Sequence, residues 1–275
     1  MLIRSFAVST LGLLLCACGS APPPPIGGVV RSFNGQPISG ATVSVEGRPL
    51  ASTTDKEGRF ALDAPPGTYQ VEIRRDGFTT EVLRVPLGLG QVFRADDVTL
   101  YPLPPKETEG VQWLGPSGPK GLHLAQLECR RDGTGTGTEP SRTDNWVVAA
   151  PVSPDAVPAV PAGRNTFAVR SQSSQSSQSS QSEPLLVRVS QEGDGALVVS
   201  KVVSSWGIEM KRTESVVPVE TTRVGKEGLL VLSVDLRPGL YVWREATRSG
   251  QLVPKPGASV ALFRAVSDPG GQSRL

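Results

Sequence analysis

Histidine and methionine are scarce in this chain of 275 residues, which contains one His and two Met. A zinc hydrolase needs several imidazole or carboxylate ligands and a general base, and one histidine does not supply them. A serine nucleophile also needs a nearby base, and His123 is the only imidazole available. His123 alternates with leucines in an expected strand, so we interpret it as a solvent-facing or hydrogen-bonded residue. We therefore predict that the chain is not an enzyme and holds no metal or cofactor.

The chain also lacks long hydrophobic runs beyond its first residues, and it lacks a dense block of one charge. No later segment approaches the roughly 18 consecutive apolar residues that are typical of a membrane-spanning helix. The formal net charge is +2, and no stretch combines closely spaced Lys and Arg with aromatic residues. These absences predict a chain without a permanent transmembrane helix and without a nucleic-acid partner.

Glycine and proline, in contrast, are abundant, with 30 Gly and 25 Pro in the chain. Both residue types favour turns and disfavour helix interiors. The length is sufficient for two domains of ordinary size, each with a hydrophobic core of its own. The composition therefore predicts an all-β protein with more than one domain.

The first residues have the pattern of an export signal. A cationic residue precedes an apolar run at 6–15, which is too short to cross a bilayer permanently. The end of this run resembles the lipobox of bacterial lipoproteins, in which a small residue stands directly before the modified cysteine. Cys18 fits this pattern, with Ala17 before it and the aliphatic Leu15 three positions away. Cys16 fits it poorly, because the bulky Leu15 would then adjoin the cleaved bond.

The lipobox resemblance implies that residues 1–17 are removed and that Cys18 becomes an acylated N-terminus. An acylated Cys18 would make membrane lipid a partner of the chain. Several acyl chains anchor a protein more firmly than one chain does. An ordinary cleavable signal with two incidental cysteines is the alternative. In known lipoproteins, an Asp directly after the modified Cys retains the protein in the inner membrane. This chain has Gly19 at that position, which by resemblance indicates the outer membrane. Residues 18–25 end in consecutive prolines, which predict an extended spacer.

The third cysteine, Cys129, has no expected disulfide partner. In the lipoprotein interpretation Cys16 leaves with the signal and Cys18 carries lipid. No histidine flanks Cys129 to activate its thiol. We therefore interpret Cys129 as a small residue that packs against its neighbours, and we expect no disulfide in the mature chain.

From Ile26 onward, short β-rich runs alternate with turn residues. Every second residue is apolar at 41–46 and again at 69–74, which is typical of strands with one buried and one solvent-facing side. The residues expected to face inwards are Ala41, Val43, Val45, Tyr69, Val71 and Ile73. Short alternating strands separated by turn sequences predict an antiparallel sandwich.

The residues that carry a family resemblance are spread across this same region. They are Gly28-x-Val30, Gly35-x-Pro37, Gly40-Ala41-x-Val43, Thr54-Asp55-x-x-Gly58-x-Phe60, Pro66-Gly67-x-Tyr69-x-Val71 and Gly77-Phe78. Together they resemble the carboxypeptidase regulatory-like domain over residues 26–101. The resemblance implies a small transthyretin-like Greek-key β-sandwich of the carbohydrate-binding-like class. It implies no peptidase activity, because in metallocarboxypeptidases this sandwich is an accessory to a separate zinc domain.

The remainder of the chain is predicted to form a second, loop-rich β-sandwich at 111–266, after a polar, Pro-rich linker at 102–110. The Ser/Gln-rich repeat at 171–182 is interpreted as a disordered loop, and 267–275 as a flexible tail. Part of the second region echoes the first. Lys226-Glu227-Gly228, Leu232-x-Val234-Asp235 and Pro238-Gly239-x-Tyr241-x-Trp243 correspond to Lys56-Glu57-Gly58, Phe60-x-Leu62-Asp63 and Pro66-Gly67-x-Tyr69-x-Val71. We therefore interpret the second region as a sandwich that ends in the same hairpin as the first.

Aromatic rings are the remaining chemical candidates, because sugars stack on exposed rings. Trp113, Trp146 and Trp206 lie in the second region, and each is interpreted as a partly buried packing residue ahead of a sugar platform. The sequence thus predicts an exported, non-enzymatic envelope lipoprotein. Its role would be that of a structural or protein-interaction module with an envelope protein or glycan as partner. A carbohydrate-binding lipoprotein that uses these tryptophans is the alternative.

Overall fold

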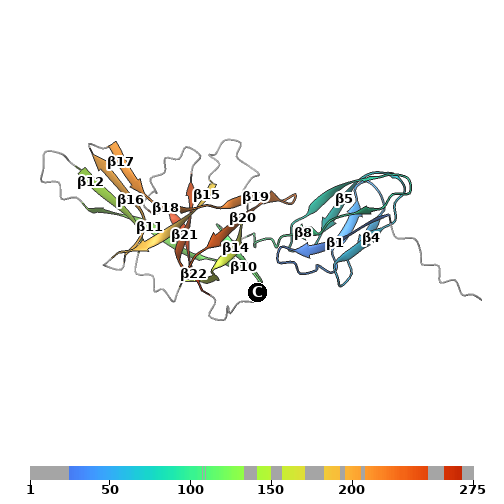
Figure 1. The fold of residues 1–275 in the computed structure, drawn as a ribbon, viewed down its shortest axis with the longest axis horizontal. Helices are drawn as coiled ribbons and strands as arrows, with labels where there is room; N and C mark the ends of the chain where they lie inside the picture. The colour runs from blue at the N-terminus through green and yellow to red at the C-terminus, as the bar shows by residue number, and fades with distance from the viewer. Residues whose placement is uncertain are drawn as a thin grey trace, which may run out of the picture.

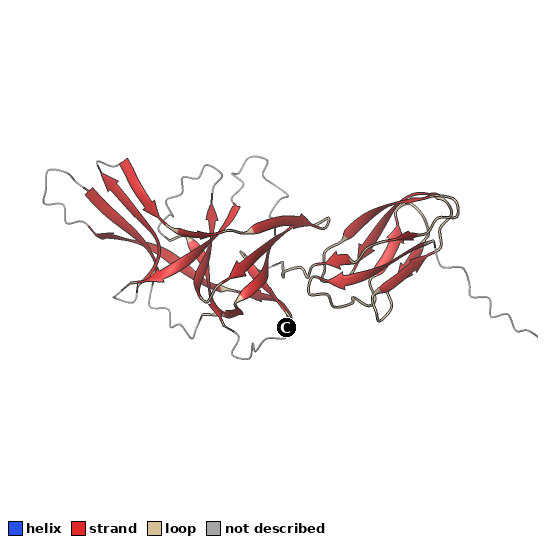
Figure 2. Cartoon of the chain, viewed as in Figure 1, coloured by secondary structure: helices blue, strands red, loops and turns tan. Residues whose placement is uncertain are grey.

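The computed structural model describes residues 25–106, 108, 110–132, 141–149, 157–170, 183–192, 196–205, 208–246 and 257–267. Every regular element within these ranges is a β-strand, so the predicted all-β fold class is confirmed (Figure 2). None of the described residues belongs to a helix that could span a membrane.

The first eight strands form a two-layered sandwich, which lies at the right of Figure 1. Their bounds are β1 Ile26–Ser32, β2 Thr42–Val45, β3 Ala51–Thr53, β4 Arg59–Leu62, β5 Gly67–Arg74, β6 Glu81–Leu87, β7 Phe93–Arg94 and β8 Val98–Leu100. In one sheet β4 is antiparallel to β1, and β7 and β8 run parallel to β1. The other sheet is antiparallel, in the order β3-β2-β5-β6.

The core of this sandwich follows the alternation in the sequence. Val43 and Val45 of β2 and Tyr69, Val71 and Ile73 of β5 are all buried, while the residues between them are more exposed. These side chains belong to the same cluster as the inward-facing residues of β1, β4 and β8. Each such aliphatic or aromatic side chain contributes roughly 1.5–3 kcal/mol by leaving water.

A glycine turn and a tyrosine corner connect the sheets of the first sandwich. Gly58 closes the turn before β4 with a φ of 76°, and its N–H donates to the Asp55 carbonyl at 3.0 Å. A corner then carries the chain from β4 to β5, which lie in different sheets. The buried Tyr69 fastens this corner, because its hydroxyl donates to the carbonyl of Pro65, four residues earlier.

The remaining strands form the second region, which contains two sheets. Their bounds are β9 Gln112–Gly115, β10 Gly118–Gly121, β11 His123–Asp132, β12 Ser141–Val148, β13 Ala159–Pro161, β14 Gly163–Val169, β15 Glu183–Gln191, β16 Leu197–Ser205, β17 Ile208–Thr213, β18 Ser215–Val217, β19 Glu220–Val224, β20 Leu229–Leu236, β21 Gly239–Ala246 and β22 Ser259–Val266. The smaller sheet has the order β10-β9-β14-β20-β19. The larger one has the order β17-β16-β12-β11-β22-β21-β15-β18, with β13 parallel to β22.

The second region has two hydrophobic cores, one more than a simple sandwich. β15 pairs with both β21 and β16, so β16, β12, β11, β22, β21 and β15 close into a ring of strands. The sandwich core, between the two sheets, includes Phe167, Trp243 and Phe263. The ring core, on the opposite face of the larger sheet, includes Val242 and Leu262. Strands β15, β21 and β22 are therefore buried on both faces.

The two sandwiches share their strand pairing, which supports the echo seen in the sequence. β1 pairs with β4 as β14 pairs with β20, and β3-β2-β5-β6 has its counterpart in β18-β15-β21-β22. The corner is repeated as well, since the Tyr241 hydroxyl donates to the Arg237 carbonyl at 2.7 Å. The interpretation of this segment as a hairpin was wrong, because β20 and β21 lie in different sheets, as β4 and β5 do. Both pairs of strands cross from one layer to the other.

The start of the expected linker at 102–110 is attached to the first sandwich. Pro102 forms a bridge with Phe78, and Leu103 N–H donates to the Gly77 carbonyl at 2.8 Å. Farther along, the Arg170 side chain donates to the Pro104 carbonyl at 2.6 Å. The expected loop at 171–182 and most of the expected tail at 267–275 lie outside the described residues.

Candidate functional site

The predicted lipidation site Cys18 and the discarded Cys16 lie outside the described residues, as does Trp206. The described chain begins at Pro25, the last residue of the expected spacer. The Pro25 carbonyl accepts a hydrogen bond from Phe93 N–H at 2.7 Å, and the next residue, Ile26, is 1% exposed. The spacer therefore enters the first sandwich at the start of β1, beside β7.

Trp113 is held in the wall of the second sandwich. Its indole Nε1 donates to Asn165 Oδ1 at 3.0 Å, and Asn165 Nδ2 in turn donates to the Pro161 carbonyl at 2.7 Å. The Lys120 ammonium lies 5.5 Å from the centre of the Trp113 ring. Trp113 is partly buried and packs against the sandwich core. Part of the ring is exposed beside a cation, which keeps it as a candidate for ligand contact.

Trp146 lies in a different place and environment. It is 3% exposed and belongs to the ring core, so it presents almost no ring surface to solvent. Its neighbour across β11 and β12 is Cys129, which is partly buried against the same core. Of the predicted tryptophans, the two that the structure describes therefore do not come together.

His123 and the acidic residues give no catalytic arrangement within the described ranges. His123 is partly buried at the start of β11, whereas the next residue, Leu124, is 61% exposed. The expected strand is present, but Leu124 faces solvent. No group of three or more His, Cys, Asp or Glu that could hold a metal occurs among the residues that the structure describes.

A polar arrangement among the described residues joins the two sandwiches, and sequence reasoning did not identify it. Glu227, in the turn between β19 and β20, accepts two hydrogen bonds from Thr80 of the first sandwich. The Thr80 N–H lies 2.9 Å from one carboxylate oxygen and the Thr80 hydroxyl 2.8 Å from the other. Lys226 N–H donates to the Thr80 carbonyl at 2.9 Å, and the Lys226 ammonium forms an ion pair with Glu72. We call this arrangement the clamp.

An apolar cluster lies beside the clamp and draws on both sandwiches. Phe33 and Tyr101 of the first sandwich stack with their ring centres 6.2 Å apart. They pack with Leu103 and Val224 against four buried residues of the second sandwich: Leu114, Ala168, Leu229 and Val231. Apolar burial and hydrogen bonds thus both contribute to the contact between the two sandwiches.

The clamp also places two carboxylates close together. The Glu81 carboxylate accepts a hydrogen bond from Gly225 N–H and lies near Glu227. Burial raises the pKa of Glu81, the hydrogen bond lowers it in part, and the charge of Glu227 raises it again. Burial, with the charge of Glu81, likewise raises the pKa of Tyr101. The stabilisation linked to Glu81 is complete below its unfolded pKa and is lost as the pH rises through its folded pKa.

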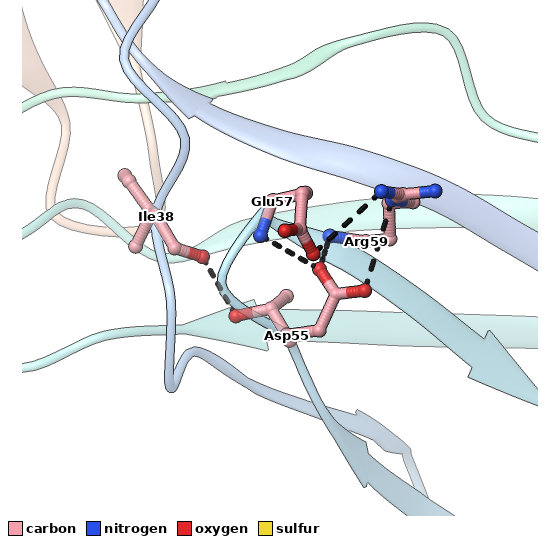
Figure 3. A network of polar contacts seen from close by, with 5 residues as sticks. Ile38, Asp55, Glu57 and Arg59 are labelled. Atoms are coloured by element: carbon pink, nitrogen blue, oxygen red, sulfur yellow. Dashed lines mark hydrogen bonds and ion pairs between the residues drawn. The ribbon is translucent and has the colours of Figure 1, made fainter.

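The repeated turn explains why Glu227 is available for this contact. In the first sandwich, Asp55 Oδ1 accepts the N–H groups of Glu57 at 3.0 Å and Arg59 at 2.8 Å, so the turn satisfies itself (Figure 3). The second sandwich has Gly225 where the first has Asp55. A Cβ on Gly225 would lie 2.7 Å from the Thr79 Cβ, so only glycine allows this close approach. The signal was present in the sequence as the one altered residue of a repeated turn.

Comparison with known proteins matches one part of the chain. Residues 25–101 fit the carboxypeptidase regulatory-like domain family, which covers the first sandwich. No curated protein sequence matches the chain. Among solved structures it is similar to a candidate carbohydrate binding protein from Bacteroides uniformis, with 10% identity over 88% of this chain and 99% of that one, at a TM-score of 0.22. It is also similar to the TIE protein of Bacillus anthracis, with 11% identity over 88% of this chain and 48% of that one, at a TM-score of 0.23. At such TM-scores neither structure bears on the function of this chain.

Proposed function

We propose that this chain is a non-enzymatic envelope lipoprotein, anchored by acylated Cys18, that carries its second sandwich at a distance from the membrane as a structural or protein-interaction module. The observation that supports this proposal most is the position of the two connections on the first sandwich. The spacer enters beside Phe93, which follows the C-terminal end of β6 by one short loop, and the clamp begins at Thr80, directly before the N-terminal end of β6. The seven residues of β6 span roughly 23 Å.

This arrangement gives the first sandwich a mechanical role. A chain held only by a flexible linker would let the second sandwich approach the membrane freely. Here the clamp and the apolar junction attach the second sandwich at the Thr80 end of β6, which lies away from the entry of the spacer beside Phe93. The first sandwich thus acts as a rigid extension of the spacer. The wing formed by β12, β16 and β17 then lies farthest from the proposed anchor.

The signal and lipobox pattern supports the membrane part of the proposal. Cys18 has the required Leu15 and Ala17, and Gly19 favours the outer membrane. The single histidine supports a role without catalysis, as the sequence predicts. The partner of the second sandwich would be an envelope protein or a glycan.

The anchor is tested by substituting each cysteine of the signal region in the full-length chain. Cys18→Ser should abolish incorporation of labelled fatty acid and shift the protein out of the detergent phase, because three acyl chains are lost. Cys16→Ser is the matched control and should leave both properties unchanged. Fatty-acid labelling that persists in Cys18→Ser would contradict the proposal.

A carbohydrate-binding lipoprotein is the second candidate, and the partial exposure of Trp113 beside Lys120 is the observation that favours it. A glycan array with the chain that begins at Ser20 distinguishes the two. We expect no reproducible binding. Binding that is lost in folded Trp113→Ala or Trp206→Ala protein would support the carbohydrate function instead. Trp146→Ala serves as a comparison, because its ring lies in the core and its loss acts through stability.

A further inference from the structure

The loop between β6 and β7 carries an apolar tip that the fold of the first sandwich does not use. We define the apolar tip as residues 88–92. Leu89 is 90% exposed, the highest value among the large apolar side chains of the described residues, and Val92 is 47% exposed. Single exposed apolar side chains are common on protein surfaces, but here two of them stand in one short loop.

The tip has a fixed conformation. Gln91 N–H donates to the Gly88 carbonyl at 3.1 Å, and the Gln91 side-chain oxygen accepts from Gly88 N–H at 3.1 Å. Gly90 has a φ of 70°, which matches the third position of a type II turn. Leu89 is thereby held at the second position of the turn, where its side chain is presented outwards. Little conformational freedom would be lost when Leu89 is buried elsewhere.

The tip lies beside the point where the spacer enters the sandwich. Phe93 follows it directly and pairs with Ile26, while Phe93 N–H donates to the Pro25 carbonyl at 2.7 Å. A spacer from Cys18 to Pro25, extended as polyproline, reaches roughly 22 Å. An acylated Cys18 would therefore limit how far the tip can move from the bilayer. The clamp lies at the other end of β6, so the second sandwich does not cover the tip.

The tip itself carries no charged side chain. The nearest charged residues along the chain are Arg84 before it and Arg94 after it, and the exposed Asp96 and Asp97 follow Arg94. The first charges on either side of the tip are therefore cations, which attract the anionic headgroups of a membrane. Apolar exposure, rigidity and position thus point to the same partner.

We propose that the apolar tip inserts Leu89 and Val92 into the surface of the bilayer that carries the acyl anchor. The occupant of this surface is lipid, and the contact makes the first sandwich stand upright on the membrane. This inference deepens the proposed function and rests on the spacer's attachment to the membrane. An acyl anchor keeps the tip at a high effective concentration near the bilayer, so that even a weak contact of the tip with lipid is populated. Peripheral membrane proteins combine two such signals for stable anchoring.

The test replaces the acyl anchor, so that it does not depend on lipidation. A polyhistidine tag takes the place of residues 1–18, and the chain is bound to phosphatidylethanolamine and phosphatidylglycerol vesicles that contain a nickel-chelating lipid. Cys129→Ala provides a background without cysteine, and an environment-sensitive fluorophore is attached to Leu89→Cys. The matched control carries the fluorophore at Val216→Cys, an apolar position of the second sandwich that is 49% exposed.

We expect the fluorescence of the Leu89 label to rise severalfold and shift to shorter wavelength on vesicles, and to be quenched by nitroxide lipids. The Val216 label should show neither change. Equal responses at both positions would overturn the proposal. A response of the Leu89 label that grows with protein concentration in the absence of vesicles would also overturn it, in favour of a second copy of the chain. A protein without acyl groups in the cell contradicts the proposed function alone, because the tag maintains the tether in this assay.

Discussion

Glu214→Ala is expected to lower the free energy of unfolding of the second domain by about 3–5 kcal/mol, because it leaves a buried guanidinium without its partner. The Arg244 side chain donates from Nε and from one terminal nitrogen to the two Glu214 oxygens, each at 2.8 Å. The two side chains are 7% and 8% exposed, so water cannot replace the lost carboxylate. All four tryptophans lie in the second region, and tryptophan fluorescence during urea unfolding therefore reports on this domain.

The same structure offers two controls for this prediction. Arg164 and Glu220 form an ion pair with both side chains more than half exposed, and Glu220→Ala should cost less than about 1 kcal/mol. The double variant Glu214→Leu with Arg244→Met removes both buried charges and should recover most of the lost stability. A cost for Glu214→Ala no larger than that for Glu220→Ala would show that the buried pair contributes little.

Gly58→Ala is expected to destabilise the first sandwich by about 2–4 kcal/mol. A φ of 76° costs an L-residue roughly 1–2 kcal/mol, and the new Cβ would lie 2.4 Å from the Val30 carbonyl oxygen. That carbonyl cannot move freely, because it accepts a hydrogen bond from Ile38 N–H at 2.9 Å. The substitution therefore forces β1 away from its neighbours.

The repeated turn provides the control for Gly58→Ala. Gly228 has a φ of 64°, but a Cβ there would meet nothing within 4 Å. Gly228→Ala should therefore cost only the backbone term, about 1–2 kcal/mol. Because the first sandwich has no tryptophan, hydrogen exchange of peptides from residues 26–101 measures the effect of Gly58→Ala. Equal costs for the two variants would mean that the contact with Val30 is relieved by a small local shift.

The first sandwich could be predicted in detail because strands such as β2, β4 and β5 have one buried and one more exposed face. The alternation at Val43 and Val45, and at Tyr69, Val71 and Ile73, is the burial pattern that the structure shows. The turn glycines and the family motif gave the same answer, and the family match covers the same residues. Local pattern and tertiary packing agree in this part of the chain.

The second region could be predicted only in outline, because its central strands serve two cores. In β22, Val260 and Leu262 face the ring core while Ala261 and Phe263 face the sandwich core, so the run is apolar throughout. Alternation carries no information where both faces are buried. The ring of strands also depends on the pairing of β11 with two partners, which local sequence does not encode.

The functional site was the least predictable part. The clamp joins residues 147 positions apart, and its carboxylate, Glu227, reads in the sequence as an ordinary turn residue. The tryptophans were visible as residue types, but the burial of Trp146 depends on the ring of strands that surrounds it. The burial of Trp146 has no local pattern that would reveal it, and the one trace of the clamp in the sequence is Gly225 in the repeated turn.

The three strands buried on both faces, β15, β21 and β22, have a consequence for how the chain loses its structure. Each of these strands contributes side chains to both cores. If one core loses its packing, the strands that also hold the other core together are no longer covered on both faces. The sandwich and the ring therefore unfold together as one cooperative unit, although the ring strand β16 and its partner β17 lie in the sequence between β15 and β18. The first sandwich shares no strand with this unit and is joined to it through the clamp and junction. Thermal unfolding should therefore show two separate transitions, one for the first sandwich and one for the second region.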